Sequence, residues 1–225
     1  IRDDDGSPGA DLNGLTHGGV VAADLAAQPG PASDTDWYVF PSDHPASYEV
    51  VVDGVSGDAQ PLAVDLMQPG DFQPQVQSAP VGVGGARSLR WSQAAGNQKI
   101  RVRSGGCTAD CGPDDTYRIR AYDTSYAIPR YNSTGGQVTV VIVQNRTDQS
   151  VSVRVRFWSE AGTMVGETQH ALTSHASAVV TAPADTKGSV TVVHDGGYGA
   201  LAGKAVALDS ANGMAFDSPM EPRRR

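Results

Sequence analysis

The sequence predicts an all-β protein built from two consecutive antiparallel β-sandwich domains. Short β-prone runs with period-2 alternation of apolar and polar residues recur along the chain, and turn residues separate them. The chain has 26 glycines and 14 prolines and few segments with a helical period. Its 225 residues and 39% hydrophobic content are sufficient for two packed cores.

The first strong strand signal is the stretch SDTDWYVF, residues 33–40. A Pro- and Gly-containing turn precedes it, and β-prone aromatic residues follow two aspartates. Because side chains alternate along a strand, Trp37 and Tyr38 point to opposite faces, and one of them is expected to anchor a core. Residues 1–15 are polar and acidic and are expected to form an extended leader.

The first domain is expected to cover residues 16–122. Its other predicted strands are 19–25, 47–52, 62–67, 88–91, 99–103 and 116–122. The span 69–80 is rich in Gln and Pro and is predicted to be a long loop.

Four arginines alternate along two of these strands: Arg101, Arg103, Arg118 and Arg120. If the two strands form a hairpin, all four guanidinium groups share one face, where like charges cost a few tenths to about 1 kcal/mol per pair. An anionic group is therefore expected nearby. It is either an intramolecular carboxylate such as Glu49 or Asp65, or the acidic surface of a partner.

Residues 10–123 resemble the bacterial pre-peptidase C-terminal (PPC) domain in the order of their motifs. The matching residues are Asp34, Asp36, Trp37, Tyr38, Phe40, Tyr48, Val50, Val52, Leu62, Asp65, Leu66, Trp91, and the runs 100–103 and 117–120. The resemblance implies a jelly-roll or PPC-like β-sandwich, of the kind appended to secreted proteases and other extracellular proteins.

The second half is predicted to hold a linker, 123–134, a sandwich, 135–220, and a basic tail, 221–225. Its predicted strands are 137–144, 151–158, 166–172, 177–182, 188–194 and 201–208. The run 137–144 is apolar on both faces and is predicted to be a central strand. The strand spacing resembles that of Ig-like bacterial surface modules, in pattern only.

The net charge of −8 lies entirely in the first half, since residues 1–122 hold 16 acidic against 8 basic residues. An acidic surface argues against nucleic acid as a partner and is compatible with Ca²⁺ binding or with solubility alone. No stretch reaches the roughly 20 apolar residues that span a bilayer. The charged start, residues 1–5, does not have the pattern of a signal peptide.

Cys107 and Cys111 are the two cysteines of the chain and lie between glycine-containing turns. Their close spacing predicts a small disulfide loop in an oxidising compartment, because two thiolates without nearby ligands form only half of a zinc site. The disulfide favours a secreted, extracellular protein at the cell surface.

Ca²⁺ is the metal that the sequence favours, since it prefers carboxylate and carbonyl oxygens. Asp34 and Asp36 precede the first strong strand, and Asp3 and Asp5 lie in the acidic leader. Collagen-binding relatives of the PPC domain bind Ca²⁺ through an acidic lead-in, so the resemblance implies a site here. The alternative is that these aspartates only form turns and are solvated.

No residue pattern predicts catalysis, so the protein is expected not to be an enzyme. The chain has no Gly-x-Ser-x-Gly nucleophile elbow. His194 and Asp195 stand side by side in a Gly-rich segment, where the aspartate could orient a base. The end of a strand followed by a turn explains the same residues without chemistry.

Four tyrosines gather near the end of the first domain: Tyr117, Tyr122, Tyr126 and Tyr131. Exposed tyrosines of this kind stack on sugars or collagen, whereas the alternative is packing between the two sandwiches. Tyr122 and Tyr126, with the four arginines, are the predicted partner-binding residues.

The sequence thus predicts a non-catalytic, secreted structural or adhesive protein of the bacterial cell exterior. A self-assembling filament or surface-layer subunit is the specific form we expect, with copies of itself or another extracellular protein or glycan as partner. The alternative is an accessory module of an extracellular hydrolase that binds its substrate, a carbohydrate or a protein. Asn132 and Asn145 also begin formal glycosylation sequons.

Overall fold

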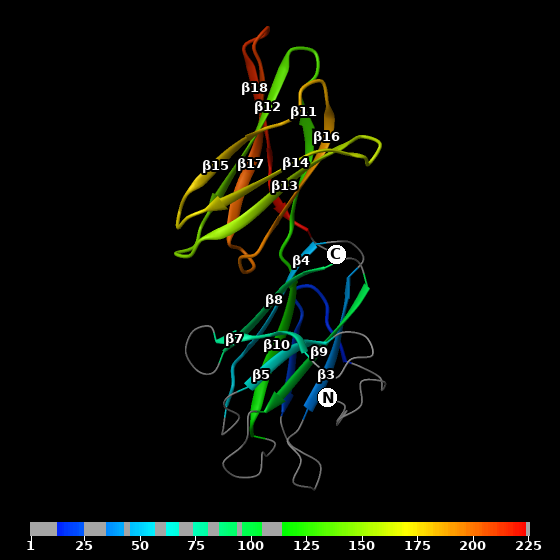
Figure 1. The fold of residues 1–225 in the computed structure, drawn as a ribbon, viewed down its shortest axis with the longest axis vertical. Helices are drawn as coiled ribbons and strands as arrows, with labels where there is room; N and C mark the ends of the chain where they lie inside the picture. The colour runs from blue at the N-terminus through cyan, green and yellow to red at the C-terminus, as the bar shows by residue number, and fades with distance from the viewer. Residues whose placement is uncertain are drawn as a thin grey trace. The chain divides into compact units, whose positions relative to one another are not determined.

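A computed structural model describes residues 13–24, 35–42, 46–56, 62–67, 74–80, 86–93, 96–104 and 114–223. Every regular element among these residues is a β-strand, which confirms the predicted all-β fold class (Figure 1). The chain divides into two compact units, the first spanning Ile1–Tyr122 and the second Asp123–Arg225.

The first unit contains two sheets. Sheet A has the order β1 (Asn13–Gly14), β3 (Thr35–Ser42), β9 (Gly96–Ser104), β5 (Leu62–Met67) and β6 (Pro74–Gln77). Sheet B has the order β2 (Val20–Asp24), β10 (Thr116–Asp123), β4 (Ala46–Asp53), β8 (Arg87–Gln93) and β7 (Ala79–Pro80). Neighbouring strands are antiparallel except for the short pair β1 and β3.

The core of the first unit lies between its two sheets and is built from alternate residues of each strand. Tyr38 and Phe40 of β3 are buried in it, and the Phe40 ring meets the Tyr48 ring of β4 edge-on at 5.7 Å between centroids. Tyr48 in turn stacks on Trp91 of β8 at 5.6 Å. Tyr38 is therefore the core anchor of the SDTDWYVF stretch, while Trp37 lies on the opposite face of β3.

Two expectations for the first unit are wrong. The strands that carry the four arginines do not form a hairpin, because β9 pairs with β3 and β5 in sheet A and β10 belongs to sheet B. Both edges of β9 are occupied, so no edge remains for β10. The predicted loop 69–80 contains β6 and β7, which extend the two sheets at their edges.

The second unit also contains two sheets (Figure 1). Sheet C has the order β14 (Met164–Leu172), β13 (Val151–Ser159), β16 (Lys187–His194), β11 (Tyr126–Asn132) and β19 (Glu221–Pro222). Sheet D has the order β15 (Ser177–Thr181), β12 (Gln137–Asn145), β17 (Leu201–Asp209) and β18 (Met214–Pro219). Their inner faces enclose an apolar core.

The linker predicted over residues 123–134 is wrong. This segment forms β11, which lies between β16 and β19 and buries Tyr126, Ile128 and Tyr131 in the core. The predicted basic tail also begins with a strand, since Glu221 and Pro222 pair with β11. Tyr126 and Ile128 alternate as in a strand, but Pro129 and Arg130 interrupt the alternation before Tyr131, at a register shift, so the strand signal of this segment is weak.

The strand order of the second unit departs from the immunoglobulin arrangement. In that arrangement the first strand joins the sheet of the second and fifth strands, and the last strand joins the sheet of the third and sixth. Here the first strand, β11, pairs with the sixth, β16, and the seventh, β17, pairs with the second, β12. The second unit is thus an antiparallel sandwich in which the first and last long strands have exchanged sheets.

Both glycosylation sequons form turns. The backbone N–H and the hydroxyl of Thr134 donate to Asn132 Oδ1 at 3.2 and 2.8 Å, and Thr147 does the same to Asn145 Oδ1 at 2.9 and 2.8 Å. Ser125 makes the equivalent pair of bonds to Asp123 Oδ1. These side chains satisfy backbone donors where strands end, which accounts for the pattern without a sugar.

Candidate functional site

Asp65 lies on the outer face of sheet A, at the centre of an ion cluster. Its Oδ2 accepts hydrogen bonds from Arg101 Nη2 at 2.7 Å and from Arg103 Nε at 2.8 Å. The Asp65 side chain is fully buried, and the Arg101 guanidinium lies over the Trp37 ring, 5.7 Å from its centroid. Burial alone raises the pKa of Asp65, but hydrogen bonds from Arg103 and Arg101 and their charges outweigh it and lower the pKa.

The other two arginines share a second carboxylate. Arg118 Nε lies 3.1 Å from Asp53 Oδ1, and Arg120 Nη2 lies 2.8 Å from Asp53 Oδ2. Glu49, which the sequence offered as a partner, instead binds Arg90 Nε at 2.8 Å and accepts a bond from Ser88. All four arginines therefore have intramolecular partners, and Asp65 is one of the carboxylates that the sequence indicated.

Asp36 belongs to a polar network inside the first sandwich. The Tyr117 hydroxyl of β10 donates to Asp36 Oδ2, and it also lies 2.6 Å from the Tyr38 hydroxyl of β3. All three side chains are buried. Desolvation, followed by the charges of Tyr38 and Asp36, raises the pKa of Tyr117 well above its ordinary value of 10.0, so its hydroxyl keeps its proton.

The predicted calcium site receives no support from the described residues. No group of three or more metal-ligating side chains occurs among the residues that the structure describes, and Asp36 binds Tyr117 inside the core. The other predicted ligands, Asp34, Asp3 and Asp5, lie outside the described residues, as do both cysteines of the predicted disulfide, Cys107 and Cys111.

Three of the four tyrosines predicted to form an exposed cluster are buried, so that cluster does not exist. Tyr117 lies in the core of the first unit, and Tyr126 and Tyr131 lie in the core of the second. Tyr122 is half-buried, and its ring meets that of His17 edge-on at 5.9 Å. Tyr117, Tyr126 and Tyr131 thus pack within the core of their own sandwich.

His194 and Asp195 make structural contacts with backbone groups of the second unit. His194 is buried, its Nε2 lies 2.8 Å from the carbonyl oxygen of Thr124, and its ring packs on Tyr126. Asp195 accepts a hydrogen bond from the Ser152 backbone N–H at 2.8 Å. The strand-end interpretation of this segment is the one that the contacts favour.

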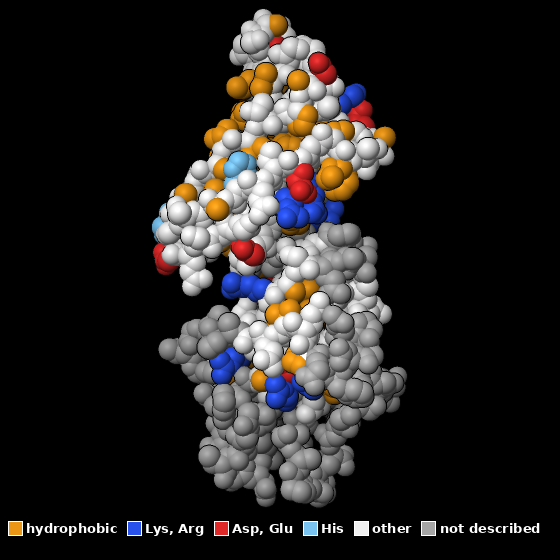
Figure 2. All heavy atoms as spheres, in the orientation of Figure 1, with side chains coloured by type: hydrophobic (Ala, Val, Ile, Leu, Met, Phe, Trp, Pro, Cys, Tyr) orange, Lys and Arg blue, Asp and Glu red, His pale blue; other side chains and the backbone are white. Residues whose placement is uncertain are grey.

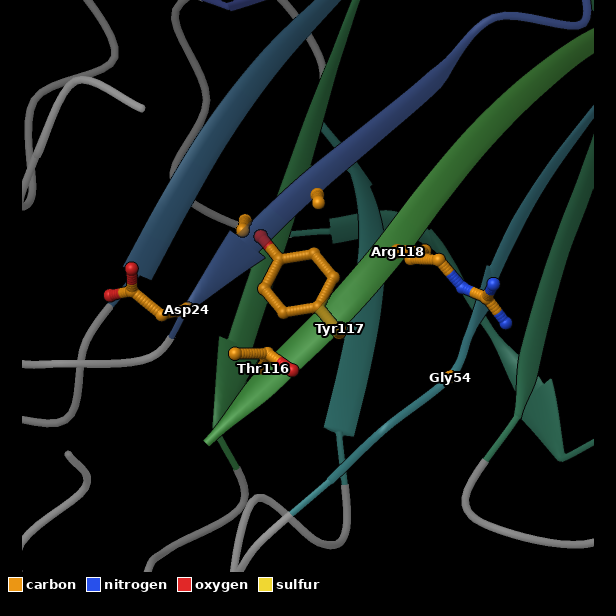
Figure 3. A pocket seen from close by; sticks show the side chains of 7 residues that line it. Asp24, Gly54, Thr116, Tyr117 and Arg118 are labelled. Atoms are coloured by element: carbon orange, nitrogen blue, oxygen red, sulfur yellow. The ribbon is translucent and has the colours of Figure 1, made fainter. Parts of the chain in front are cut away.

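A shallow groove crosses the outer face of sheet B in the first unit (Figure 3). It has a volume of about 470 Å³ and runs over the small residues Ala22 and Gly54. Asp24, Thr116 and Arg118 supply its polar lining, and Arg118 is the residue already paired with Asp53. The lining of the groove offers hydroxyl and charged groups.

Exposed apolar side chains gather on the second unit. Among the described residues, the large apolar side chains that are exposed are Val20 in the first unit and Val138, Met164, Val179, Tyr198, Leu208, Met214 and Phe216 in the second. Figure 2 shows hydrophobic side chains spread over the second unit, with charged side chains at several places beside them. The sequence contained one signal for this surface, the run 137–144 that is apolar on both faces.

No protein-family model matches the chain, and no curated protein matches it. Among solved structures, the chain is similar to the pre-peptidase C-terminal domain of a collagenase from Bacillus anthracis. The sequence identity is 15%, the TM-score is 0.39, and the match covers 52% of this chain and 99% of that domain. No helix among the described residues is long and apolar enough to cross a membrane.

Proposed function

We propose that this protein is a non-catalytic structural or adhesive component of the bacterial cell exterior, which assembles into a filament or surface layer. The observation that carries the proposal is the concentration of exposed apolar side chains on the second unit. Exposed apolar side chains that are neighbours on a surface, as Val138 and Leu208 are, are typical of protein–protein contacts. The polar residues that suggested chemistry, His194, Asp195 and Asp36, are engaged in structural contacts, which also favours a non-catalytic role.

The location outside the cell rests on the motif order of the first unit. The described residues that are shared with the PPC pattern, which are all of them except Asp34, fall on β3, β4, β5, β8, β9 and β10, and we propose that the first unit is a member of that class. PPC domains occur in secreted proteins, and the predicted disulfide between Cys107 and Cys111 requires an oxidising compartment.

Labelling of intact cells and microscopy of the purified protein test this proposal. A membrane-impermeant amine reagent should modify the protein on intact cells of the native organism, and a cytoplasmic protein should stay unlabelled as a control. Electron microscopy of the purified full chain should show ordered assemblies. A protein that is protected in intact cells, or is strictly monomeric at high concentration, would contradict the proposal.

The groove of the first unit favours a second candidate, an accessory binding module of an extracellular hydrolase. A groove lined by Asp24, Thr116 and Arg118 has the hydroxyl and charged groups that bind glycans or peptides. Co-sedimentation with insoluble polysaccharides and with collagen fibres tests it. Filling the groove with Ala22→Trp should abolish binding, whereas the exposed change Val20→Ala on the same strand should preserve it.

A further inference from the structure

The outer face of sheet D is apolar. In the register of β12 with β17, Val138 pairs with Leu208 and Val140 with Val206, and these residues alternate with the buried ones. Val179 of the edge strand β15 pairs with Ile142 and is 64% exposed. Val138 and Leu208 are 48% and 47% exposed. Because their neighbours on the opposite face fill the core, these residues form an apolar patch on the outer face of sheet D, with the exposed polar residues Gln144, Ser177 and Thr181 around it. Antiparallel sheets usually present a polar face to water.

Sheet C of the same unit shows the usual pattern. The outer faces of β13 and β14 carry Arg154, Arg156 and Glu167, and Arg156 Nε lies 2.7 Å from Glu167 Oε2. The apolar outer face is therefore a property of sheet D and not of the whole unit.

The charges on the outer face of sheet D cancel. Lys204 of β17 and Asp217 of β18 point to this face, and their charged groups lie 2.8 Å apart. The net charge of −8 lies in residues 1–122, whereas residues 123–225 hold nine acidic and nine basic residues, so the unit that contains sheet D carries no net charge that would oppose self-association. This face is electrically neutral, and two copies that meet through it bring no like charges into contact.

The size and shape of the face fit contact with an identical face. β12 and β17 have nine residues each, which at about 3.4 Å per residue is roughly 30 Å, and four strands at about 4.8 Å are roughly 19 Å wide. Allowing for the shorter β15 and β18, each copy offers roughly 500 Å², and two copies bury roughly 1,000 Å², the lower bound for a specific interface. Two such faces pack aligned at a spacing of about 10 Å, as in a sandwich.

We infer that the outer face of sheet D is a contact surface for a second copy of this chain, which packs through the same face in a two-fold arrangement. The inference rests on the proposed function, since it names one contact through which the copies assemble. Each contact buries Val138, Val140, Ile142, Val179, Val206 and Leu208 from both copies. The small area predicts a weak contact that repetition in an assembly reinforces.

Sedimentation velocity of the full chain, run up to its highest soluble concentration, tests the inference. Wild-type protein should self-associate, and Leu208→Glu and Val179→Glu should each raise the dissociation constant by at least about tenfold, because a buried carboxylate without a partner opposes association. Met164→Glu changes a residue of similar exposure, 51%, on sheet C, and should behave as wild type. Near-ultraviolet circular dichroism verifies that each variant is folded, and Val179→Glu at the sheet edge serves if Leu208→Glu does not fold.

A mixing experiment tests whether the face contacts its own copy. Leu208→Lys alone should also dissociate, and an equimolar mixture of Leu208→Lys with Leu208→Glu should associate again. If wild type assembles and the Leu208 and Val179 variants assemble equally well, the inference is wrong and the proposed function stands. If wild type is monomeric at every concentration, both are wrong. Dissociation of the variants without recovery on mixing overturns the two-fold contact in which Leu208 of one copy meets Leu208 of the other.

Discussion

The two sandwiches bury polar groups in different places. In the first unit, buried carboxylates stand within strands and meet side chains of neighbouring strands, as Asp65 and Glu49 do. In the second unit, the buried polar groups that make the most hydrogen bonds stand at strand ends and hold turns, as Asn145 does. Charge pairs thus help to fix which strands meet in the first unit, whereas apolar alternation and turn geometry do so in the second. Stability should therefore depend on charge and pH more strongly in the first unit.

The largest expected effect is that of Asp65→Ala. Removing this fully buried carboxylate leaves Arg101 and Arg103, whose side chains are 19% and 38% exposed, without their shared partner and should destabilise the first unit by about 3 kcal/mol. Hydrogen exchange followed by mass spectrometry measures the stability of each unit separately. The matched control is Asp53→Ala, which also removes a carboxylate shared by two arginines but at a more exposed place, and should cost about 1 kcal/mol or less. Equal losses in the two variants would refute the role of burial.

Asn145→Ala should have the next largest effect, and it should act on the second unit. The Asn145 amide donates to the carbonyl oxygens of Gln149, Leu172 and Thr173, and its Oδ1 accepts two bonds from Thr147. Leaving these groups unsatisfied should cost about 2–3 kcal/mol. Denaturant unfolding, followed by the fluorescence of Trp158 in a variant without the other two tryptophans, measures it.

Asn132→Ala is the control for that prediction. Asn132 makes the same turn with Thr134 but is only half-buried and donates to the Gln137 side chain, so its loss should be smaller. A larger loss for Asn132→Ala would show that burial of the turn does not determine its contribution.

Tyr117→Phe should destabilise the first unit by about 1–3 kcal/mol. The change removes the hydroxyl that donates to Asp36 and leaves that buried network with one donor fewer. Tyr131→Phe is the control in the second unit, because it removes a single bond to Thr186 at 3.1 Å, and about 1 kcal/mol or less is expected. Urea unfolding of each variant against wild type measures both losses. If the two variants lose the same stability, the hydrogen bonds of the Asp36 network contribute no more to stability than the single bond of Tyr131.

The smallest predicted effect is a loss of stability of the first unit in acid. The pKa of Asp65 in the folded protein lies below its ordinary value of 3.8, so the unfolded chain takes up the proton first as the pH falls. The stability that ionised Asp65 contributes is complete above pH 3.8 and is lost as the pH falls through the lower folded pKa.

Hydrogen exchange at a series of pH values measures this acid effect. In the variant Asp65→Asn, the stability of the first unit should fall less steeply as the pH is lowered. In the second unit, the pKa values of Asp209 and Asp217 are also lowered, by hydrogen bonds from Asn212 and Lys204 respectively. Both carboxylates are exposed to solvent screening, so the second unit should change less. If the second unit loses stability more steeply in acid than the first, the stronger pH dependence that we expect for the first unit is wrong.

Sequence patterns were sufficient to predict the all-β class and the position of most strands. Alternation is a local property, so the predicted strand 62–67 coincides with β5, and the run 137–144 lies within β12, in the interior of sheet D as predicted. The sequence also named Asp65 among the carboxylates that meet the arginines. The missed strand β11 shows the limit, because its alternation is interrupted by Pro129 and Arg130.

Sequence patterns did not predict which strands are neighbours or which surfaces remain open. Sequence proximity suggested a hairpin of β9 and β10, yet β9 lies between β3 and β5, from which it is separated by tens of residues. The pairing of β9 with β5 brings Arg101 and Arg103 to Asp65. The burial of Tyr117, Tyr126 and Tyr131 likewise follows from the positions of β10 and β11 within their sheets. The second apolar face of β12 is visible in the sequence, but its exposure is not, because what covers a sheet depends on contacts between distant parts of the chain.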